Sequence, residues 1–576
     1  MKAKRTVVSN PSSPLAKPSS DTPNLSIKEA IANEAPVVES PQRDEKDMGR
    51  YLNRTNNGFA SDRKFPFYVD KSLLIKETNA CFGIDQMKFM CVTRPRRFGK
   101  TMALKMLNAY YAKESDSREL FKDLKISEDP SFEEHLNKHN VLWVDMGSIY
   151  TGLKDPNLFV EEIKRRLLGE LIRNYPRSRL KGLSLSDAIT KLYLKKGERF
   201  IFLIDEWDVI YREEERNKKL CDSYTKFLRD LFKSSDVSDC FDLVYMTGIL
   251  PIRRYFTQST LNMFTEYNML SPRELAPLFG FTEAEVKSLC EKHNANFEQI
   301  KNWYDGYRLN GLEIYSPKSV VEAIRVGACR KFWTASSAIE AVTDYMNFDK
   351  GALKAEIMRM LAGDKVELDP DKFSNDLTRV DSKDAALAVL VHLGYLAFIP
   401  DSIGAKGACY IPNREIQEEF ENALEALDWK DIYDPISNSP KLLQATIDGD
   451  VEEINRGLDK NHKDLASPFS KSDEGVLGIV TIVSYYRARS FYEIRKEEVS
   501  MKGRSDVSFF PIAPGRKPII VELKVGKSPD EAIAQIKEKA YWEAWPHYKG
   551  KVLLVGITYD SKTLKHSSKV EWIDVD

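Results

Sequence analysis

The chain has 576 residues, of which 42% are hydrophobic and 30% are charged, and its formal net charge at pH 7 is −1. A chain of this length exceeds one hydrophobic core, so we expect about three domains. The near-zero charge excludes a protein held on nucleic acid by a global positive field, and any such binding must use a local basic surface. The scattered cysteines indicate free thiols in a reducing compartment, and no apolar run is long enough to span a membrane. We therefore expect an intracellular, cytoplasmic protein.

Residues 1–55 have a composition unlike the rest of the chain. They are rich in Ser and Pro after a short basic start, Met1–Arg5, and they contain no apolar signal-peptide core. Because such a segment cannot bury enough apolar surface to fold, we expect a disordered tail. A targeting role for the basic start is the alternative interpretation.

The segment Arg94–Thr101, RPRRFGKT, carries the strongest local signal. It ends in the Gly-Lys-Thr of a phosphate-binding loop, although Arg94 stands where the general pattern has its first glycine. The apolar run Phe89–Thr93 before it predicts a buried strand, and Met102–Tyr111 after it predicts a helix. A loop between a strand and a helix directs its N–H groups and the helix N-terminus toward phosphates.

This loop predicts nucleotide binding, with ATP and Mg²⁺ as cofactors. We expect Lys100 to reach the β- and γ-phosphates and Thr101 to hold Mg²⁺. The other loop residues expected to contact the nucleotide are Arg94, Arg96, Arg97, Phe98 and Gly99. A basic loop that contains Gly-Lys-Thr by chance is the alternative.

An acidic pair completes the predicted nucleotide site. Asp205 and Glu206 follow the apolar run 199–204, which is typical of a buried parallel strand. Open α/β sheets bind ligands at the carboxyl ends of their strands. We therefore expect Asp205 to bind Mg²⁺ through water and Glu206 to orient or deprotonate the attacking water. Thr247, at the end of the predicted strand 241–248, is a candidate polar sensor of the γ-phosphate or the water.

The order of predicted elements gives the fold class. Strands alternate with helices over residues 56–275, which predicts an α/β domain with a parallel sheet and helices on both faces. A helical lid is expected over residues 276–345, and a mainly helical middle region over residues 346–460. Residues 461–576 then change to short strands around the apolar core helix Val476–Tyr486.

The last region contains a second group of candidate catalytic residues. Glu522 and Lys524 lie two residues apart on a predicted strand and so share one face. Asp506 lies beside them if its own predicted strand pairs with theirs as a hairpin. Two carboxylates and a Lys suit Mg²⁺-assisted phosphodiester hydrolysis, because the carboxylates hold the metal and the Lys positions water or stabilises charge. A solvated Glu–Lys pair on a surface strand is the alternative.

Taken together, the segments before residue 416 resemble the AAA-ATPase-like family, whose members often carry a C-terminal nuclease domain. The family's loop itself reads Arg-Pro-Arg-Arg-Phe-Gly-Lys, so Arg94 is no departure from it. The resemblance implies a P-loop AAA-type ATPase. It rests on Tyr68–Ser72, Arg94–Thr101, Leu203–Asp208, Thr247–Leu250, Ser259–Phe264, Gly280–Val286, Trp303–Tyr307, Phe332–Ser336, Leu393–Leu396 and Ile411–Glu415.

The C-terminal region resembles the PD-(D/E)XK nuclease superfamily. The resemblance lies in Asp506, fifteen intervening residues, and then Glu522-x-Lys524. It implies a small α/β restriction-endonuclease-like domain, a further metal ligand at Glu497 and a supporting role for Gln535 on the following helix. Two details stay open. Glu498 is an alternative to Glu497, and residue 501 is Met where the family's turn has Gly.

These observations predict an ATP-gated nuclease that acts on nucleic acid, with DNA favoured over RNA. The alternative is a regulatory ATPase switch whose C-terminal domain binds nucleic acid or a partner without cleavage. The resemblance also allows a homo-oligomer in which Arg253 or Arg254 acts on a neighbouring subunit.

Overall fold

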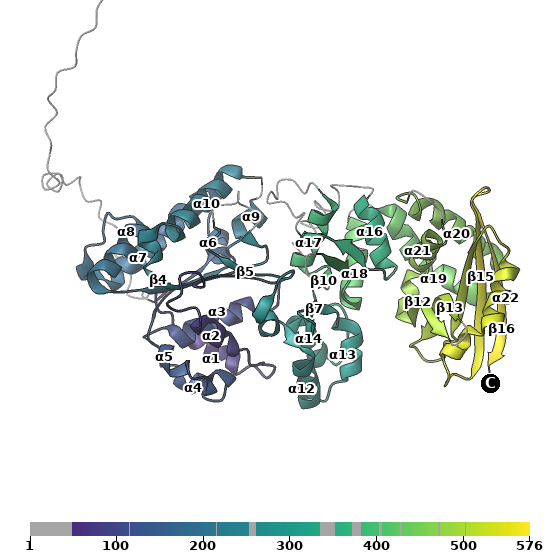
Figure 1. Ribbon diagram of the computed structural model, residues 1–576, viewed down its shortest axis with the longest axis horizontal. Helices are drawn as coiled ribbons and strands as arrows, with labels where there is room; N and C mark the ends of the chain where they lie inside the picture. Colours follow the sequence, from purple (N-terminus) through teal and green to yellow (C-terminus); the bar gives the residue numbers. More distant parts are fainter. Residues whose placement is uncertain are drawn as a thin grey trace, which may run out of the picture. The chain divides into compact units, whose positions relative to one another are not determined.

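We describe the protein from a computed structural model (Figure 1). The structure describes residues 49–114, 116–214, 216–252, 261–333, 352–370, 382–401, 406–426, 429–469, 473–500 and 503–575. Most of the predicted tail therefore lies outside the described residues. So do Arg253, Arg254, Met501 and the side chain of Glu498.

A parallel sheet forms the centre of residues 49–267. Within the described residues its strand order is β2–β3–β4–β1–β5, and every neighbouring pair runs parallel. This parallel sheet confirms the predicted fold class. Its central strands are buried on both faces, which explains why their sequences are continuously apolar. The strands are β1 Phe89–Thr93, β2 Asn140–Asp145, β3 Phe200–Asp205, β4 Phe241–Gly248 and β5 Thr265–Tyr267.

Helices cover both faces of this sheet (Figure 1). Successive residues of a strand point to opposite faces, so Phe202 of β3 packs in one core and Leu203 in the other. On the first face lie α6 Met146–Thr151, α7 Phe159–Asn174, α8 Leu185–Lys196, α9 Val209–Glu213, α10 Lys218–Phe232 and α11 Ser235–Ser238. On the second lie α1 Asn57–Arg63, α2 Leu73–Asn79, α3 Lys100–Tyr111, α4 Arg118–Phe121 and α5 Phe132–His135.

The region predicted as a helical lid also contains a small antiparallel sheet. Its described strands are ordered β6–β8–β7. Asn310 and Gly311 connect β7 to β8 with φ angles of 50° and 77°, as an Asn-Gly hairpin turn requires. The elements are β6 Phe281–Thr282, α12 Glu283–His293, α13 Phe297–Tyr304, β7 Tyr307–Leu309, β8 Leu312–Tyr315 and α14 Pro317–Val326.

The middle region likewise combines helices with a sheet. In the described part of this region, three antiparallel strands are ordered β10–β11–β9. The prediction of a mainly helical segment is therefore incomplete. The elements are α16 Ala352–Leu361, β9 Val366–Leu368, α17 Lys383–Leu393, β10 Ala397–Pro400, β11 Gly407–Tyr410 and α18 Arg414–Ala426.

A mixed sheet closes the chain, in the order β12–β13–β14–β15–β16 among the described residues. Only its β14–β15 pair is parallel. The strands are β12 Tyr492–Ser500, β13 Gly503–Pro511, β14 Ile519–Val525, β15 Gly550–Asp560 and β16 Lys565–Val575. The helices are α19 Lys430–Asp448, α20 Val451–Leu465, α21 Glu474–Ser484 and α22 Pro529–Lys539.

The predicted boundary after residue 460 falls inside α20. Helix α20 packs against α21 and β16, and the ring of His462 stacks on Tyr559 of β15 at 3.9 Å between centroids. Helix α20 thus packs on elements of the last sheet. No helix among the described residues is both long and apolar enough to cross a membrane.

Candidate functional site

The predicted phosphate loop connects β1 to α3 at the carboxyl edge of the parallel sheet. Gly99 precedes α3 with φ 90°, a left-handed conformation that glycine adopts without strain. The Nζ atom of Lys100 donates to the carbonyl oxygens of Arg94 and Pro95, each at 2.8 Å. Burial lowers the pKa of Lys100 to about 8. The loop thus holds a largely desolvated ammonium at its centre.

Asp205 lies directly beside this loop, as predicted. Its Oδ2 accepts a hydrogen bond from Thr101 at 2.7 Å, and its Oδ1 accepts one from Thr247 at 2.6 Å. A hydroxyl and a carboxylate in contact offer the hard oxygen atoms that Mg²⁺ prefers. The pair Thr101 and Asp205 therefore fits the predicted metal position.

Two predicted site residues, Arg94 and Thr247, have side chains that do not line the cavity described below. Arg94 is fully buried and donates to the carbonyl oxygens of Thr93 and Tyr267, each at 2.8 Å. Its guanidinium also lies over the ring of Phe279. Thr247 is buried behind Asp205 and does not line the cavity. Arg94 thus ties β1 to β5, and Thr247 orients Asp205.

A cavity of about 880 Å³ opens in front of the loop, a volume in the range of small-molecule sites. It extends from the loop to the ends of β2 and β3 and to α14. The other predicted loop residues do line it: Arg96, Arg97, Phe98, Gly99, Lys100 and Thr101. The ring of Phe98 also packs edge-on against Tyr307, with 5.6 Å between centroids.

Glu206 stands at the wall of the same cavity. Its backbone has φ 51°, an uncommon conformation for a non-glycine residue, and its side chain is half exposed. A Cβ atom on Gly147 would lie 2.5 Å from Glu206 Oε2, so a larger residue there would displace the Glu206 carboxylate. Burial raises the pKa of Glu206, and the Arg212 charge opposes this effect.

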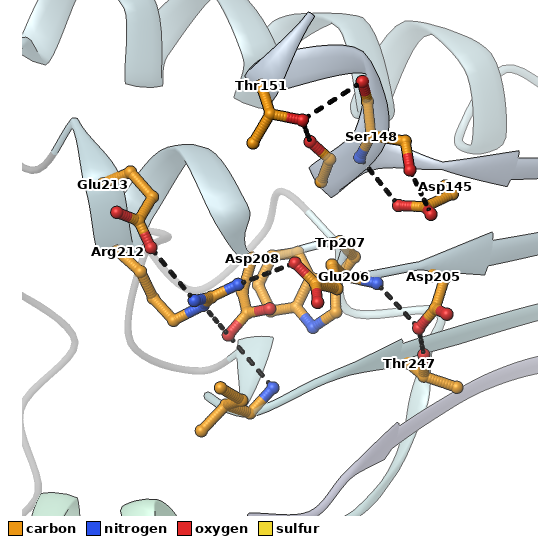
Figure 2. Close-up of polar contacts among 12 residues, drawn as sticks. Asp145, Ser148, Thr151, Asp205, Glu206, Trp207, Asp208, Arg212, Glu213 and Thr247 are labelled. Atoms are coloured by element: carbon orange, nitrogen blue, oxygen red, sulfur yellow. Dashed lines mark hydrogen bonds and ion pairs between the residues drawn. The ribbon is translucent and has the colours of Figure 1, made fainter. Parts of the chain in front are cut away.

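Two residues beside Glu206 were missed by the sequence interpretation (Figure 2). Asp208 Oδ2 accepts hydrogen bonds from the backbone N–H groups of Ile249 at 3.0 Å and Leu250 at 2.9 Å. Arg212 contacts both Asp208 and Glu206. The signal was present, because Asp208 and Arg212 are four residues apart and a helix brings such residues together.

The C-terminal candidates come together in the predicted way. Strands β13 and β14 are antiparallel, with Val507 opposite Val521, and the next residues along are Asp506 and Glu522. Asp506 Oδ2 accepts a hydrogen bond from the N–H of Leu523 at 2.7 Å. The hairpin thus places the two carboxylates on neighbouring strands.

Glu522 is the centre of this cluster. Lys524 Nζ lies 2.6 Å from Glu522 Oε1, and Gln535 Nε2 donates to the same oxygen. Gln535 is itself bonded to the Tyr541 hydroxyl at 2.9 Å. The contacts among Glu522, Lys524 and Gln535 agree with the predicted site, and Tyr541 is an addition to it.

The environment of Glu522 is unusual for a carboxylate. Its side chain is 1% exposed, and its Oε2 has no hydrogen-bond partner among the described residues. Burial raises the pKa of Glu522 to about 7, and the Asp506 charge adds to the shift. Since buried polar atoms are normally paired, the free oxygen fits a position that binds a ligand. Asp506 and Glu522 therefore fit the predicted metal.

Glu497, the predicted further metal ligand, lies at the exposed edge of the cluster. It lies at an irregularity of β12 with φ 52°, it is 65% exposed, and Arg504 Nη1 approaches it at 3.5 Å. Burial raises the pKa of Asp506, and the charges of Glu497 and of Glu474, at the start of α21, add to this shift. Sequence spacing missed Glu474, because only the packing of α21 on the sheet brings it near.

Comparisons with known proteins agree with both regions. Residues 62–255 match the AAA-ATPase-like model, described as a predicted AAA-ATPase. Residues 473–569 match a model of the PD-(D/E)XK nuclease superfamily. The chain carries an AAA-ATPase-like domain followed by a PD-(D/E)XK nuclease superfamily domain. The resemblance read from the sequence motifs is thereby confirmed.

Individual relatives are distant. An uncharacterized protein in the vnfD 5' region of Azotobacter chroococcum mcd 1 is 22% identical over 324 residues, which cover 53% of this chain and 60% of that protein. The Aeropyrum pernix ORC1 protein in complex with DNA is 12% identical, with a TM-score of 0.24 over 66% of this chain and 97% of its own. The S. cerevisiae Hsp104–ADP complex is 11% identical, with a TM-score of 0.27 over 76% of this chain and 50% of the Hsp104 chain.

Proposed function

We propose that the protein is a nucleotide-gated nuclease. Its AAA-ATPase-like domain binds and hydrolyses ATP with Mg²⁺, and its PD-(D/E)XK domain cleaves nucleic acid, DNA rather than RNA, with a second Mg²⁺. The observation that carries the proposal is Glu522, a buried carboxylate with one unpaired oxygen beside Asp506 and Lys524. Leaving such a group unpaired is costly, so it indicates a functional site.

In the ATPase domain, each residue has a role that its position supports. Lys100 neutralises charge on the β- and γ-phosphates, and its two backbone partners hold it in place before binding. Thr101 and Asp205 would hold Mg²⁺, which neutralises phosphate charge when bound. Thr247 fixes the orientation of Asp205. Glu206, at the cavity wall, orients the attacking water and accepts its proton.

In the nuclease domain, Asp506 and Glu522 would hold the metal. When bound, Mg²⁺ polarises the scissile phosphate and favours ionisation of a water molecule. Lys524 orients that water and stabilises the negative charge that develops on the phosphate. Gln535 fixes the Glu522 carboxylate through a hydrogen bond, and Tyr541 fixes Gln535 in turn.

Gating requires a route from the phosphate loop to the rest of the protein. Phe98 of the loop packs on Tyr307, and the Tyr307 hydroxyl donates to the carbonyl oxygen of Gly394 at 2.5 Å. A Cβ atom on Gly394 would lie 2.9 Å from Cβ of Pro95, so the loop rests directly on this glycine. A shift of the loop on nucleotide binding would therefore press on the end of α17.

The same contacts continue toward the nuclease site. One hydrophobic cluster of the described residues contains Phe98, residues of α17 to α21, and Val521 and Leu523. The last two flank Glu522 in β14. Close-packed cores transmit strain, so this cluster supports ATP gating of the nuclease.

Cleavage assays test the proposal. Plasmid DNA, linear DNA and RNA are incubated with the full chain, with Mg²⁺ or EDTA, and with or without ATP. We expect Mg²⁺-dependent cleavage of DNA that Glu522→Ala abolishes. The matched control is Glu538→Ala, which removes an exposed carboxylate of α22. Equal cleavage by wild type and Glu522→Ala would rule out the nuclease site, and DNA binding without cleavage would support the regulatory-switch alternative.

A further inference from the structure

Arg212 of α9 bridges two carboxylates at the edge of the nucleotide cavity (Figure 2). Its Nε donates to Asp208 Oδ2 at 3.1 Å, and its Nη2 lies 3.3 Å from Glu206 Oε2. A third contact joins Nη1 to Glu213 at 3.3 Å. The Arg212 side chain is 10% exposed, and its contact with the buried Asp208 is shielded from water, whereas Glu206 is half exposed.

Asp208 gives this bridge a rigid anchor. Its side chain is fully buried, and its Oδ2 accepts hydrogen bonds from the N–H groups of Ile249 and Leu250, just after β4. Strand β4 lies between β1 and β3 in the central sheet. Through Asp208, Arg212 is therefore fixed to the same sheet that carries the phosphate loop.

Glu206 needs such a fixed partner. Its backbone is left-handed, with φ 51°, and half of its side chain is exposed. The glycine at position 147 leaves room for the carboxylate but offers it no side-chain support. A general base must hold its geometry within a fraction of an ångström to act on one water molecule.

We propose that Arg212 is a positioning residue for Glu206, which it links to the sheet through Asp208. This inference rests on the proposed ATPase activity and adds to it the residue that sets the geometry of the water-activating carboxylate. Arginine suits the role because its planar group presents separate N–H donors to two carboxylates at once, whereas a lysine offers one point of charge.

Arg212 also lines the cavity, so direct contact with the γ-phosphate is the competing role. The two roles predict different effects of replacing Arg212 when Glu206 is also replaced. A positioning residue acts through Glu206, so its loss should have no further effect once Glu206 is replaced. A phosphate contact should instead weaken ATP binding whether or not Glu206 is present.

The test is a double-mutant cycle on the full chain with Arg212→Gln, Glu206→Gln and both together. The readouts are kcat and KM for ATP hydrolysis and the affinities for ATP and ADP. We expect Arg212→Gln to lower kcat by about 10-fold or more while both affinities change less than about twofold. The double variant should hydrolyse ATP no more slowly than Glu206→Gln alone.

Two further variants allow the inference to be tested even if Arg212→Gln folds poorly. Arg212→Lys retains the charge but can serve only one carboxylate at a time, so we expect an intermediate kcat. Arg229→Gln is the matched control, because Arg229 is an exposed arginine of α10 that forms an ion pair with the neighbouring Asp230. It should leave kcat and KM unchanged.

Three results would overturn the inference. The first is a wild-type kcat for both Arg212 variants. The second is a loss from Arg212→Gln that multiplies with the loss from Glu206→Gln. The third is a selective loss of ATP over ADP binding in both backgrounds, which would assign Arg212 to the phosphate. Absence of ATP hydrolysis in the wild type would instead refute the proposed function, and the positioning role with it.

Discussion

Lys100 and Glu206 have separable roles in the nucleotide site. Lys100→Ala removes the ammonium from the centre of the loop, so we expect ATP hydrolysis to be lost and ATP binding to weaken by at least about 10-fold. Glu206→Gln should keep binding and lose turnover, because the amide cannot accept a proton. Phosphate release and nucleotide affinity measure the two effects. Wild-type hydrolysis by Lys100→Ala would show that the loop is not a phosphate site.

Asp506 and Glu522 should act as a unit in the nuclease site. They lie on neighbouring strands and would share one metal, so Asp506→Ala, Glu522→Ala and the double variant should lose cleavage to a similar low level. ATP hydrolysis should survive in all three, since the sites lie in different domains. Losses of the two single variants that multiply in the double variant would mean that the carboxylates act independently.

Lys524 supports cleavage without serving as a metal ligand. Its ammonium is hydrogen-bonded to Glu522 and would orient the attacking water. We expect Lys524→Ala to lose cleavage while it still binds Mg²⁺, which calorimetry can measure. The matched control is Lys537→Ala, an exposed lysine of α22 paired with Glu571. Loss of Mg²⁺ binding together with cleavage would refute this role.

Some of these residues could be predicted from spacing, and others could not. Glu522 and Lys524 are two residues apart in a strand, so their common face follows from backbone geometry alone. The direction of the Arg94 side chain does not, because it is set by a carbonyl oxygen of Tyr267, a distant residue in sequence. Glu474 likewise depends on helix packing that no local pattern records.

The α20 helix shows the same limit for whole elements. The spacing of its apolar residues predicted a helix. Its packing on the last sheet depends on contacts with β16, which lies about 100 residues later in the chain. The hairpin β7–β8 was missed although Asn310-Gly311 is a strong turn signal, because its strands are only three and four residues long.

The packing of α20 on the last sheet should depend on pH. His462 is buried against Tyr559 and contacts His566 at 3.2 Å, and burial lowers the pKa of His462 to about 4. In the unfolded chain His462 takes up a proton near pH 6.5, whereas in the folded protein it stays neutral until about pH 4. The contribution of neutral His462 to the free energy of unfolding is therefore complete above pH 6.5 and is lost as the pH falls toward 4. We expect the free energy of unfolding to be lower by about 2 kcal/mol at pH 5 than at pH 7 because of this residue.

Urea unfolding at pH 7 and pH 5 measures this effect. The His462→Phe variant keeps a ring on Tyr559 but cannot titrate, so its loss of stability between the two pH values should be smaller by that amount. His547→Phe, at an exposed position, is the control and should behave like wild type. Equal pH dependence in wild type and His462→Phe would contradict the account.

At the scale of the whole molecule, Gly394 is the contact between the phosphate loop and α17. Gly394→Ala would place a Cβ atom 2.9 Å from Pro95 Cβ at a backbone φ of 92°. Gly363 has the same φ with open space around its Cβ position, so Gly363→Ala is a matched control for backbone strain alone. Backbone strain should cost each variant about 1 kcal/mol of stability, and Gly394→Ala should lose more because of its contact with Pro95.

Only Gly394→Ala should change the response to nucleotide. We expect it to reduce the effect of ATP on DNA cleavage, because the loop can no longer rest on α17 in its present position. Hydrogen exchange in α17 with and without ATP gives a second readout that does not depend on nuclease activity. An unchanged ATP response of both cleavage and exchange in Gly394→Ala would refute this route of coupling.

The central claim is that the nucleotide state of one domain controls cleavage by the other. The most direct measurement is the initial rate of Mg²⁺-dependent cleavage of linear DNA, with and without ATP, for wild type, Lys100→Ala and Glu206→Gln. We predict that ATP changes the wild-type rate, that Glu206→Gln keeps this response because it binds ATP, and that Lys100→Ala loses it. An identical ATP response in wild type and Lys100→Ala, or no response in any of the three, would contradict the claim.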